Sequence, residues 1–125
     1  MRLLLDTHAL LWWLADNPRL GVDARTAVAD PVSEVFVSAA SAWEIAIKKA
    51  IGKLEAPDDL PEQIRSHHFS ELPIKVSHAL AAGSLPRHHE DPFDRLLVAQ
   101  ARIEGLTLVS HDQWAPAYGV PVLAT

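Results

Sequence analysis

A short run of leucines that stops at a carboxylate constrains the fold of this chain more than any other feature. Leu3–Leu5 are apolar without alternation, as expected for a parallel strand whose two faces are both covered. Asp6 follows at the carboxyl end of that strand, where an open α/β sheet has its ligand crevice. An apolar helix pattern, Ala9–Ala15, begins almost at once. Because Asp6 or Thr7 could simply cap that helix, the role of Asp6 depends on where the other acids lie.

Short apolar strands and helices alternate along the rest of the chain. Further strands are predicted at Val35–Val37, at Leu106–Val109 and within Tyr118–Val122, where Pro121 favours an edge position. Leu72–Ile74 is a candidate short edge segment. Further helices are predicted over residues 22–29, 38–51, 61–68, 77–83 and 92–104. This alternation predicts an α/β fold, a parallel sheet with helices on both faces.

Composition restricts the class of protein. We expect residues 1–125 to form a single domain with one core. The chain has no cysteine, which excludes disulfides and thiolate metal sites and suits a cytoplasmic location. Its first apolar run is too short for a signal peptide, and no stretch approaches the roughly 20 residues that span a membrane. The net charge of −5 argues against a broad nucleic-acid binder, although carboxylates neutralised by a divalent metal can act on a polyanion.

Four acids are expected at one edge of the sheet. In a right-handed βαβ unit the helix runs antiparallel to the strands, so its first turn lies beside the strands' carboxyl ends. Asp6 directly follows the first strand, and Glu44 lies in the second turn of the helix after the second strand. Asp94 lies in the first turn of the helix before the third strand, and Asp112 just beyond that strand's end. Asp112 taken alone resembles an ordinary turn residue.

Two of these acids also have ordinary structural interpretations. Glu44 could close a capping box with Ser41 or pair with Lys48 one turn later. Asp91 and Asp94 have the spacing of a capping box, and Asp91 is the better N-cap because Pro92 follows it. Asp94 would then be the freer carboxylate, beside the apolar stripe of its helix, where it needs a cation or hydrogen bonds.

Four segments that carry the acids occur in order along the chain: LLLDTH at 3–8, SAASAWEI at 38–45, DPFDRLLVAQA at 91–101 and TLVSHD at 107–112. Together they resemble the successive blocks of a PIN domain, and more narrowly the VapC-type toxin nucleases of bacterial toxin–antitoxin pairs. The resemblance implies a three-layer α/β/α fold with a short central parallel sheet. It implies a Mg²⁺- or Mn²⁺-dependent endoribonuclease with Asp6, Glu44, Asp94 and Asp112 as its catalytic and metal-binding residues. It also implies an RNA substrate, a homodimer and a small VapB-type antitoxin that lies along the active-site groove.

The chemistry of these residue types agrees with that implication. Mg²⁺ takes carboxylate and phosphate oxygens and keeps several waters, and an acid cluster without cysteine suits it better than Zn²⁺. Our hypothesis is that the metal makes water nucleophilic and stabilises charge on the scissile phosphate, which leaves a 5′-phosphate and a 3′-hydroxyl. Asp6 and Asp94 are the better direct ligands, whereas Glu44 and Asp112 would hold ordered waters or a second ion.

Other polar residues have less specific roles at this stage. Thr7 or Ser38 would orient the carboxylates by hydrogen bonds. The adjacent pairs His67–His68 and His88–His89 lack the spacing of a helical zinc motif and are expected to be solvated. The cations on the two acid-bearing helices are candidate RNA contacts or ordinary solvated residues; they are Lys48, Lys49, Lys53, Arg95 and Arg102.

Two further interpretations compete with a nuclease. A catalytically silent PIN-like module would bind RNA or protein through the same crevice. An aspartate-based phosphotransfer domain is disfavoured. A haloacid-dehalogenase-like phosphatase needs a second aspartate two residues after Asp6, where His8 stands. A receiver domain needs a lysine at the end of a late strand, and none follows Val109. Trp12, Trp13 and Trp43 exceed what one small core needs, which indicates an apolar surface for a partner.

Overall fold

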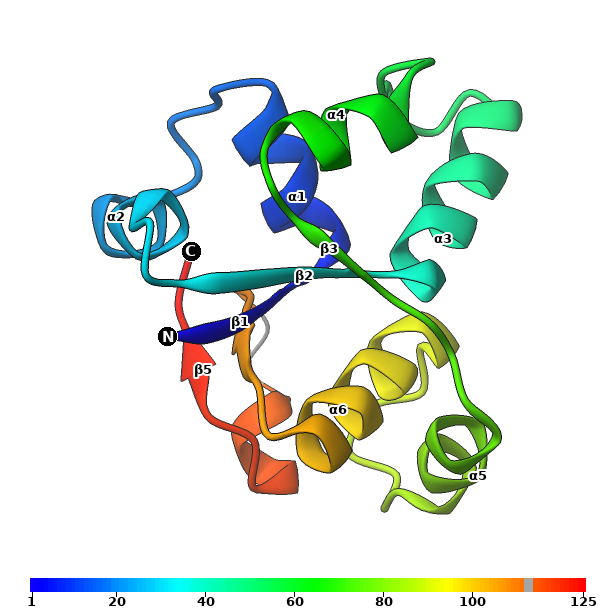
Figure 1. The fold of residues 1–125 in the computed structure, drawn as a ribbon. Coiled ribbons are helices and arrows are strands. Elements are labelled where there is room, and N and C mark those ends of the chain that lie inside the picture. Colours follow the sequence, from blue (N-terminus) through cyan, green and yellow to red (C-terminus); the bar gives the residue numbers. More distant parts are fainter. Residues whose placement is uncertain (112–113) are drawn as a thin grey trace.

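A parallel sheet forms the centre of the computed structural model, which describes residues 1–111 and 114–125. Its strands are β1 (Arg2–Leu5), β2 (Glu34–Ser38), β3 (Ser70–Leu72), β4 (Thr107–Val109) and β5 (Val122–Leu123). They lie in the order β3-β2-β1-β4-β5, and every neighbouring pair is parallel (Figure 1). The helices are α1 (Thr7–Leu14), α2 (Val22–Ala29), α3 (Ala39–Ala50), α4 (Leu60–Ser66), α5 (Val76–Ser84), α6 (Pro92–Glu104) and the 3₁₀ helix η1 (Ala115–Tyr118). The predicted α/β class is confirmed.

Helices cover both faces of the sheet, and successive side chains of a strand point to opposite faces. Leu3 and Leu5 pack into one apolar cluster with α1, α2 and α4, whereas Leu4 packs into a second cluster with α6 and η1. Figure 1 shows these two layers on either side of the strands, with α3 beyond the end of β2 and α5 beside α6. Because β1 is central and both its faces are covered, its three leucines need no polar alternation.

A proline adjoins each of the two edge strands. β3 begins two residues before the predicted segment Leu72–Ile74. It ends at Leu72, because Pro73 has no N–H to donate to a neighbouring strand. β5 begins directly after Pro121 and lies at the opposite edge, as predicted. The edge position of the last strand was therefore predicted correctly, but the strand begins four residues later than predicted, because Tyr118 belongs to η1.

Polar side chains cap the starts of α1, α3 and α6. An Asp6 carboxylate oxygen accepts a hydrogen bond from the Ala9 N–H at 2.7 Å and caps α1. Ser38 caps α3, and Asp91 caps α6. Gly105 ends α6 at φ 66°, a left-handed conformation that favours glycine. The first turns of α1, α3 and α6 therefore face the same edge of the sheet.

The tryptophans differ in how much of each side chain is buried. Trp12 and Trp13 are half-buried against the first apolar cluster, so they belong largely to the core. Trp43 is 62% exposed on α3.

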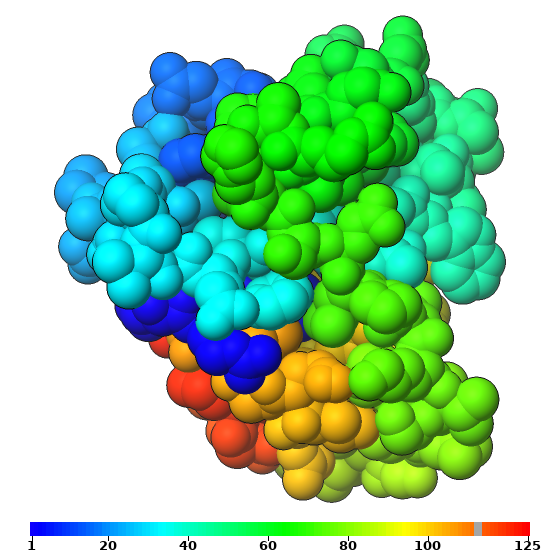
Figure 2. Space-filling model, viewed as in Figure 1, coloured from blue at the N-terminus to red at the C-terminus, as the bar shows by residue number. Residues whose placement is uncertain are grey.

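The start of β1 lies at the surface, at the amino edge of the sheet. The exposed Arg2 donates to the Glu104 carbonyl at 2.8 Å. In the space-filling view the blue N-terminal residues lie between the cyan and orange segments (Figure 2). Among the described residues, no helix has the length and apolarity needed to cross a bilayer.

Candidate active site

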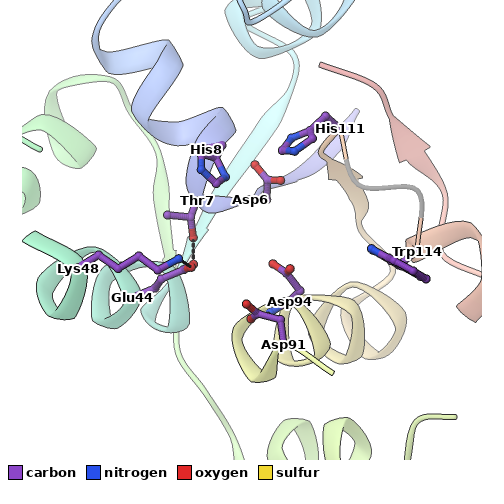
Figure 3. A pocket seen from close by; sticks show the side chains of 9 residues that line it. All are labelled: Asp6, Thr7, His8, Glu44, Lys48, Asp91, Asp94, His111 and Trp114. Atoms are coloured by element: carbon purple, nitrogen blue, oxygen red, sulfur yellow. Dashed lines mark hydrogen bonds and ion pairs between the residues drawn. The ribbon is translucent and has the colours of Figure 1, made fainter. Parts of the chain in front are cut away.

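Carboxylates from three separate elements line one cleft of about 500 Å³ at the carboxyl edge of the sheet (Figure 3). Its lining residues are Asp6, Thr7, His8, Glu44, Lys48, Asp91, Asp94, His111 and Trp114. Three of the acids selected from the sequence therefore meet in one place, and Asp91 joins them. The fourth, Asp112, lies outside the described residues.

Asp6 is a buried carboxylate, with 7% of its surface exposed. Burial raises its pKa above the ordinary value, and hydrogen bonds from the Ala9 N–H and the Ser110 hydroxyl and the nearby His8 and His111 rings oppose that rise. An ionised Asp6 is therefore costly unless a cation lies near it. Sequence analysis missed Ser110, although its place directly after β4 was a usable signal.

Two donors hold Glu44, which is only 4% exposed. The Thr7 hydroxyl donates to one of its oxygens at 2.6 Å, and the Lys48 ammonium donates to the other at 2.5 Å. The hydrogen bond to Glu44 raises the pKa of Lys48, which therefore stays charged. Of the two structural interpretations, the Lys48 pair is present and the capping box is not, because the Ser41 hydroxyl has no hydrogen-bond partner in the described structure. Thr7 orients a carboxylate as predicted.

Asp91 and Asp94 divide their tasks as the capping argument predicts. One Asp91 oxygen accepts from the Phe93 N–H at 2.9 Å and the Asp94 N–H at 3.1 Å. An Asp94 oxygen instead lies 2.7 Å from Nε2 of His89. The His89 ring in turn stacks parallel to Trp114. The expectation that His89 is solvated was wrong, because its side chain is only 22% exposed and its ring is engaged by Asp94 and Trp114.

Ser38 does not orient a carboxylate, contrary to one of the two candidate roles. Its hydroxyl donates to the Gln100 side-chain oxygen at 2.5 Å, and the Gln100 amide donates to the Pro73 carbonyl at 3.2 Å. Ser38 and Gln100 are both fully buried. This bond ties the start of α3 to the middle of α6. A glutamine on the apolar stripe of a helix was the signal that a buried polar partner existed.

Arg95 is committed to the backbone rather than offered to RNA. Its guanidinium donates to four carbonyls, that of Ala82 in the last turn of α5 and those of Leu85, Pro86 and His89 between α5 and α6. It therefore fixes the segment that carries His89, so the interpretation of Arg95 as an ordinary solvated residue was wrong.

The donor set suits a hard divalent cation. Carboxylates face one cleft, the most buried of them is costly to ionise alone, and the sequence has no thiolate to offer a softer metal. In the described parts of the chain no three His, Asp or Glu side chains are already arranged around one ion position. In this structure Glu44 pairs with Lys48 and Asp94 with His89. The residues fit such an ion as a set of candidate ligands.

The family model for the PIN domain matches residues 3–118. The chain belongs to the PIN-domain family. It is 35% identical over 118 residues to "Ribonuclease VapC22" of Mycobacterium tuberculosis, an alignment that covers 88% of this chain and 86% of that relative. The PIN family and the VapC relationship predicted from the four acidic segments are therefore confirmed.

Solved structures agree on the fold at low sequence identity. DNA-bound VapBC from Salmonella typhimurium has a TM-score of 0.68 at 16% identity and covers 99% of this chain and 98% of its own. VapBC2 from Rickettsia felis, bound to a promoter DNA fragment, has a TM-score of 0.67 at 14% identity, with coverages of 100% and 99%. Both share the PIN-like architecture of this chain.

Proposed function

We propose that this PIN domain, spanning residues 1–125, is a divalent-metal-dependent endoribonuclease that acts in the cytoplasm as the toxin of a toxin–antitoxin pair. The observation that carries the proposal is the meeting of Asp6, Glu44 and Asp94, from three elements, in one cleft. The name of the VapC22 relative, a ribonuclease, supports RNA as the substrate. The reaction would be hydrolysis of RNA phosphodiesters to a 5′-phosphate and a 3′-hydroxyl.

Asp6 and Asp94 would hold Mg²⁺ or Mn²⁺ directly, and Glu44 and Asp112 would hold ordered waters or a second ion. When bound, such an ion lowers the pKa of water and stabilises negative charge on the scissile phosphate. The buried position of Asp6 supports its role, because a cation would offset the cost of its ionisation. Asp91 shapes the cleft by capping α6, so Asp94 keeps its place in the first turn.

Thr7 and Lys48 set the state of Glu44. The Thr7 hydroxyl fixes the direction of one carboxylate oxygen, and the Lys48 ammonium pairs with the other. Among the described residues that line the cleft, Lys48 is the one lysine or arginine. It is therefore the side chain that would meet a phosphate oxygen when Glu44 turns toward a cation.

The decisive experiment incubates the protein with total RNA and Mg²⁺, with and without a chelator, and maps the ends of the fragments. Cleavage should require the ion and leave 5′-phosphates. Asp6→Asn and Asp94→Asn should stay folded and lose cleavage. Asp58→Asn is the matched control, because its side chain is 97% exposed and does not line the cleft. Cleavage by both cleft variants would contradict the proposal, and RNA binding without cleavage would favour the silent module.

A VapB-type antitoxin and a second copy of the chain are the proposed partners. The neighbours in the PIN fold include VapBC assemblies, which supports an antitoxin partner. Trp43 and Ile47 lie one turn apart on α3, and Ile51 follows at its C-cap. They are 62%, 38% and 60% exposed, which supports an apolar face that a partner covers. A homodimer should therefore be seen by light scattering, and a stable monomer at micromolar concentration would contradict it.

A further inference from the structure

An aromatic pair stands at the margin of the acidic cleft. The rings of Trp114 and His89 are parallel within 2°, with centroids 5.1 Å apart. Trp114 lines the cleft and is 46% exposed. In the close-up it lies on the far side of Asp94 from Glu44 and Lys48 (Figure 3). One side of the indole is therefore supported by His89 while much of the ring remains accessible to solvent.

Tyr118 holds the two halves of this pair together. Its hydroxyl donates to the Pro86 carbonyl at 2.8 Å and accepts from the backbone N–H groups of His88 and His89 at 3.1 and 3.0 Å. Tyr118 ends η1, the helix that begins directly after Trp114. A single buried hydroxyl thus connects the segment of Trp114 to the segment of His89.

The His89 side is fixed from α6 as well. Arg95 donates to the His89 carbonyl at 3.0 Å, and Asp94 binds the His89 ring at 2.7 Å. The pair is therefore built before any ligand arrives. A preorganised surface loses little side-chain entropy on binding, so more of its contact energy remains available for affinity.

The charge of the cleft argues that this surface matters for RNA. Four carboxylates line the cleft, and Lys48 is the one lysine or arginine among its described lining residues. Side chains there offer little attraction to a phosphate backbone. Contacts to the bases would therefore add to the affinity that a bound cation and Lys48 supply, and aromatic faces are the usual stacking surface for unpaired bases of any sequence.

We propose that Trp114, supported by His89, stacks on an unpaired nucleobase of the RNA beside the carboxylates. The inference rests on the proposed ribonuclease function and assigns a base-binding position within its cleft. A base exposes its face only when it leaves a duplex, so the probe for this position is a single-stranded RNA. Trp114 is a substrate-binding residue in this scheme, and it takes no part in the chemical step.

Binding measured in EDTA separates this inference from catalysis. The probes are a labelled single-stranded RNA oligonucleotide and an abasic strand with the same number of phosphates, followed by fluorescence anisotropy. Trp114→Ala should raise the Kd for the base-bearing strand on the order of tenfold, the range of one lost stacking contact. It should leave the Kd for the abasic strand unchanged. Trp114→Phe should retain part of the affinity, because a smaller aromatic face remains.

A matched control and steady-state kinetics complete the test. Ile103→Ala removes an equally exposed apolar side chain, 47% against 46%, from the far end of α6, and it should change neither Kd. With Mg²⁺, Trp114→Ala should raise KM and leave kcat close to that of the wild type.

Two results would overturn the stacking proposal: an unchanged Kd for Trp114→Ala, or an equal loss on both strands. Failure of the wild type to cleave RNA with Mg²⁺ or Mn²⁺ would instead refute the proposed ribonuclease function. The binding data in EDTA would still show whether Trp114 stacks on a base.

Discussion

The buried bond between Ser38 and Gln100 provides the most quantitative test of how this fold holds its site. Both side chains are fully buried, and their 2.5 Å hydrogen bond joins the start of α3, which carries Glu44, to α6, which carries Asp94. The perturbations are Ser38→Ala, Gln100→Leu and the double variant. They remove one partner at a time and then both.

The expected free energies follow from which polar groups each variant leaves unpaired. Gln100→Leu leaves the buried Ser38 hydroxyl without an acceptor, whereas the carbonyl of the exposed Pro73 can bond water instead. One unsatisfied buried group costs about 1–3 kcal/mol, and we expect a loss of about that size. Ser38→Ala strands the Gln100 oxygen and removes an N-cap worth about 1 kcal/mol, a total of about 2–4 kcal/mol. The double variant strands neither member of the pair, so its loss should fall short of the sum by about 1–3 kcal/mol.

Urea unfolding followed by circular dichroism measures these losses. A domain of this size is stable by about 5–15 kcal/mol, so the single variants should still fold. Equal m-values across the four proteins would show that only stability has changed. Additivity within about 0.5 kcal/mol would refute the reasoning, because it would mean that the two side chains do not interact in solution.

Two further predictions concern the carboxylates. Thr7→Val removes the hydroxyl that orients Glu44, so the rate of RNA cleavage in a Mg²⁺ titration should fall by about 10- to 100-fold. Thr7→Ser keeps a hydroxyl and should retain most of the activity. Equal rates for both variants would contradict the role of that bond. Burial raises the pKa of Asp6, so the native state prefers its neutral form, and stability falls as pH rises through that raised pKa. In EDTA, Asp6→Asn should therefore have a higher Tm than the wild type at pH 7. The difference in Tm should vanish below about pH 4, where Asp6 is protonated in both the folded and the unfolded state. A wild type that is more stable than the variant at pH 7 would refute this prediction.

Local patterns were enough to predict the elements and the edge at which the acids gather. Strand and helix periods depend on near neighbours, and Asp91 could be separated from Asp94 because Pro92 marks the first turn of α6. The chirality of βαβ units then brings Asp6, Glu44 and Asp94 to the carboxyl edge without knowledge of the strand order. Those conclusions come from the sequence alone.

The partners of those acids were decided by tertiary structure. The order β3-β2-β1-β4-β5 sets which helix starts lie next to each other, and no local period encodes it. Ser38 and Gln100 are 62 residues apart, and Tyr118 reaches the backbone of His89 across 29. The ring of His89 turned inward because Arg95 and Tyr118 bind the backbone around it. Such contacts depend on packing between segments far apart in the chain, so only the folded structure could assign them.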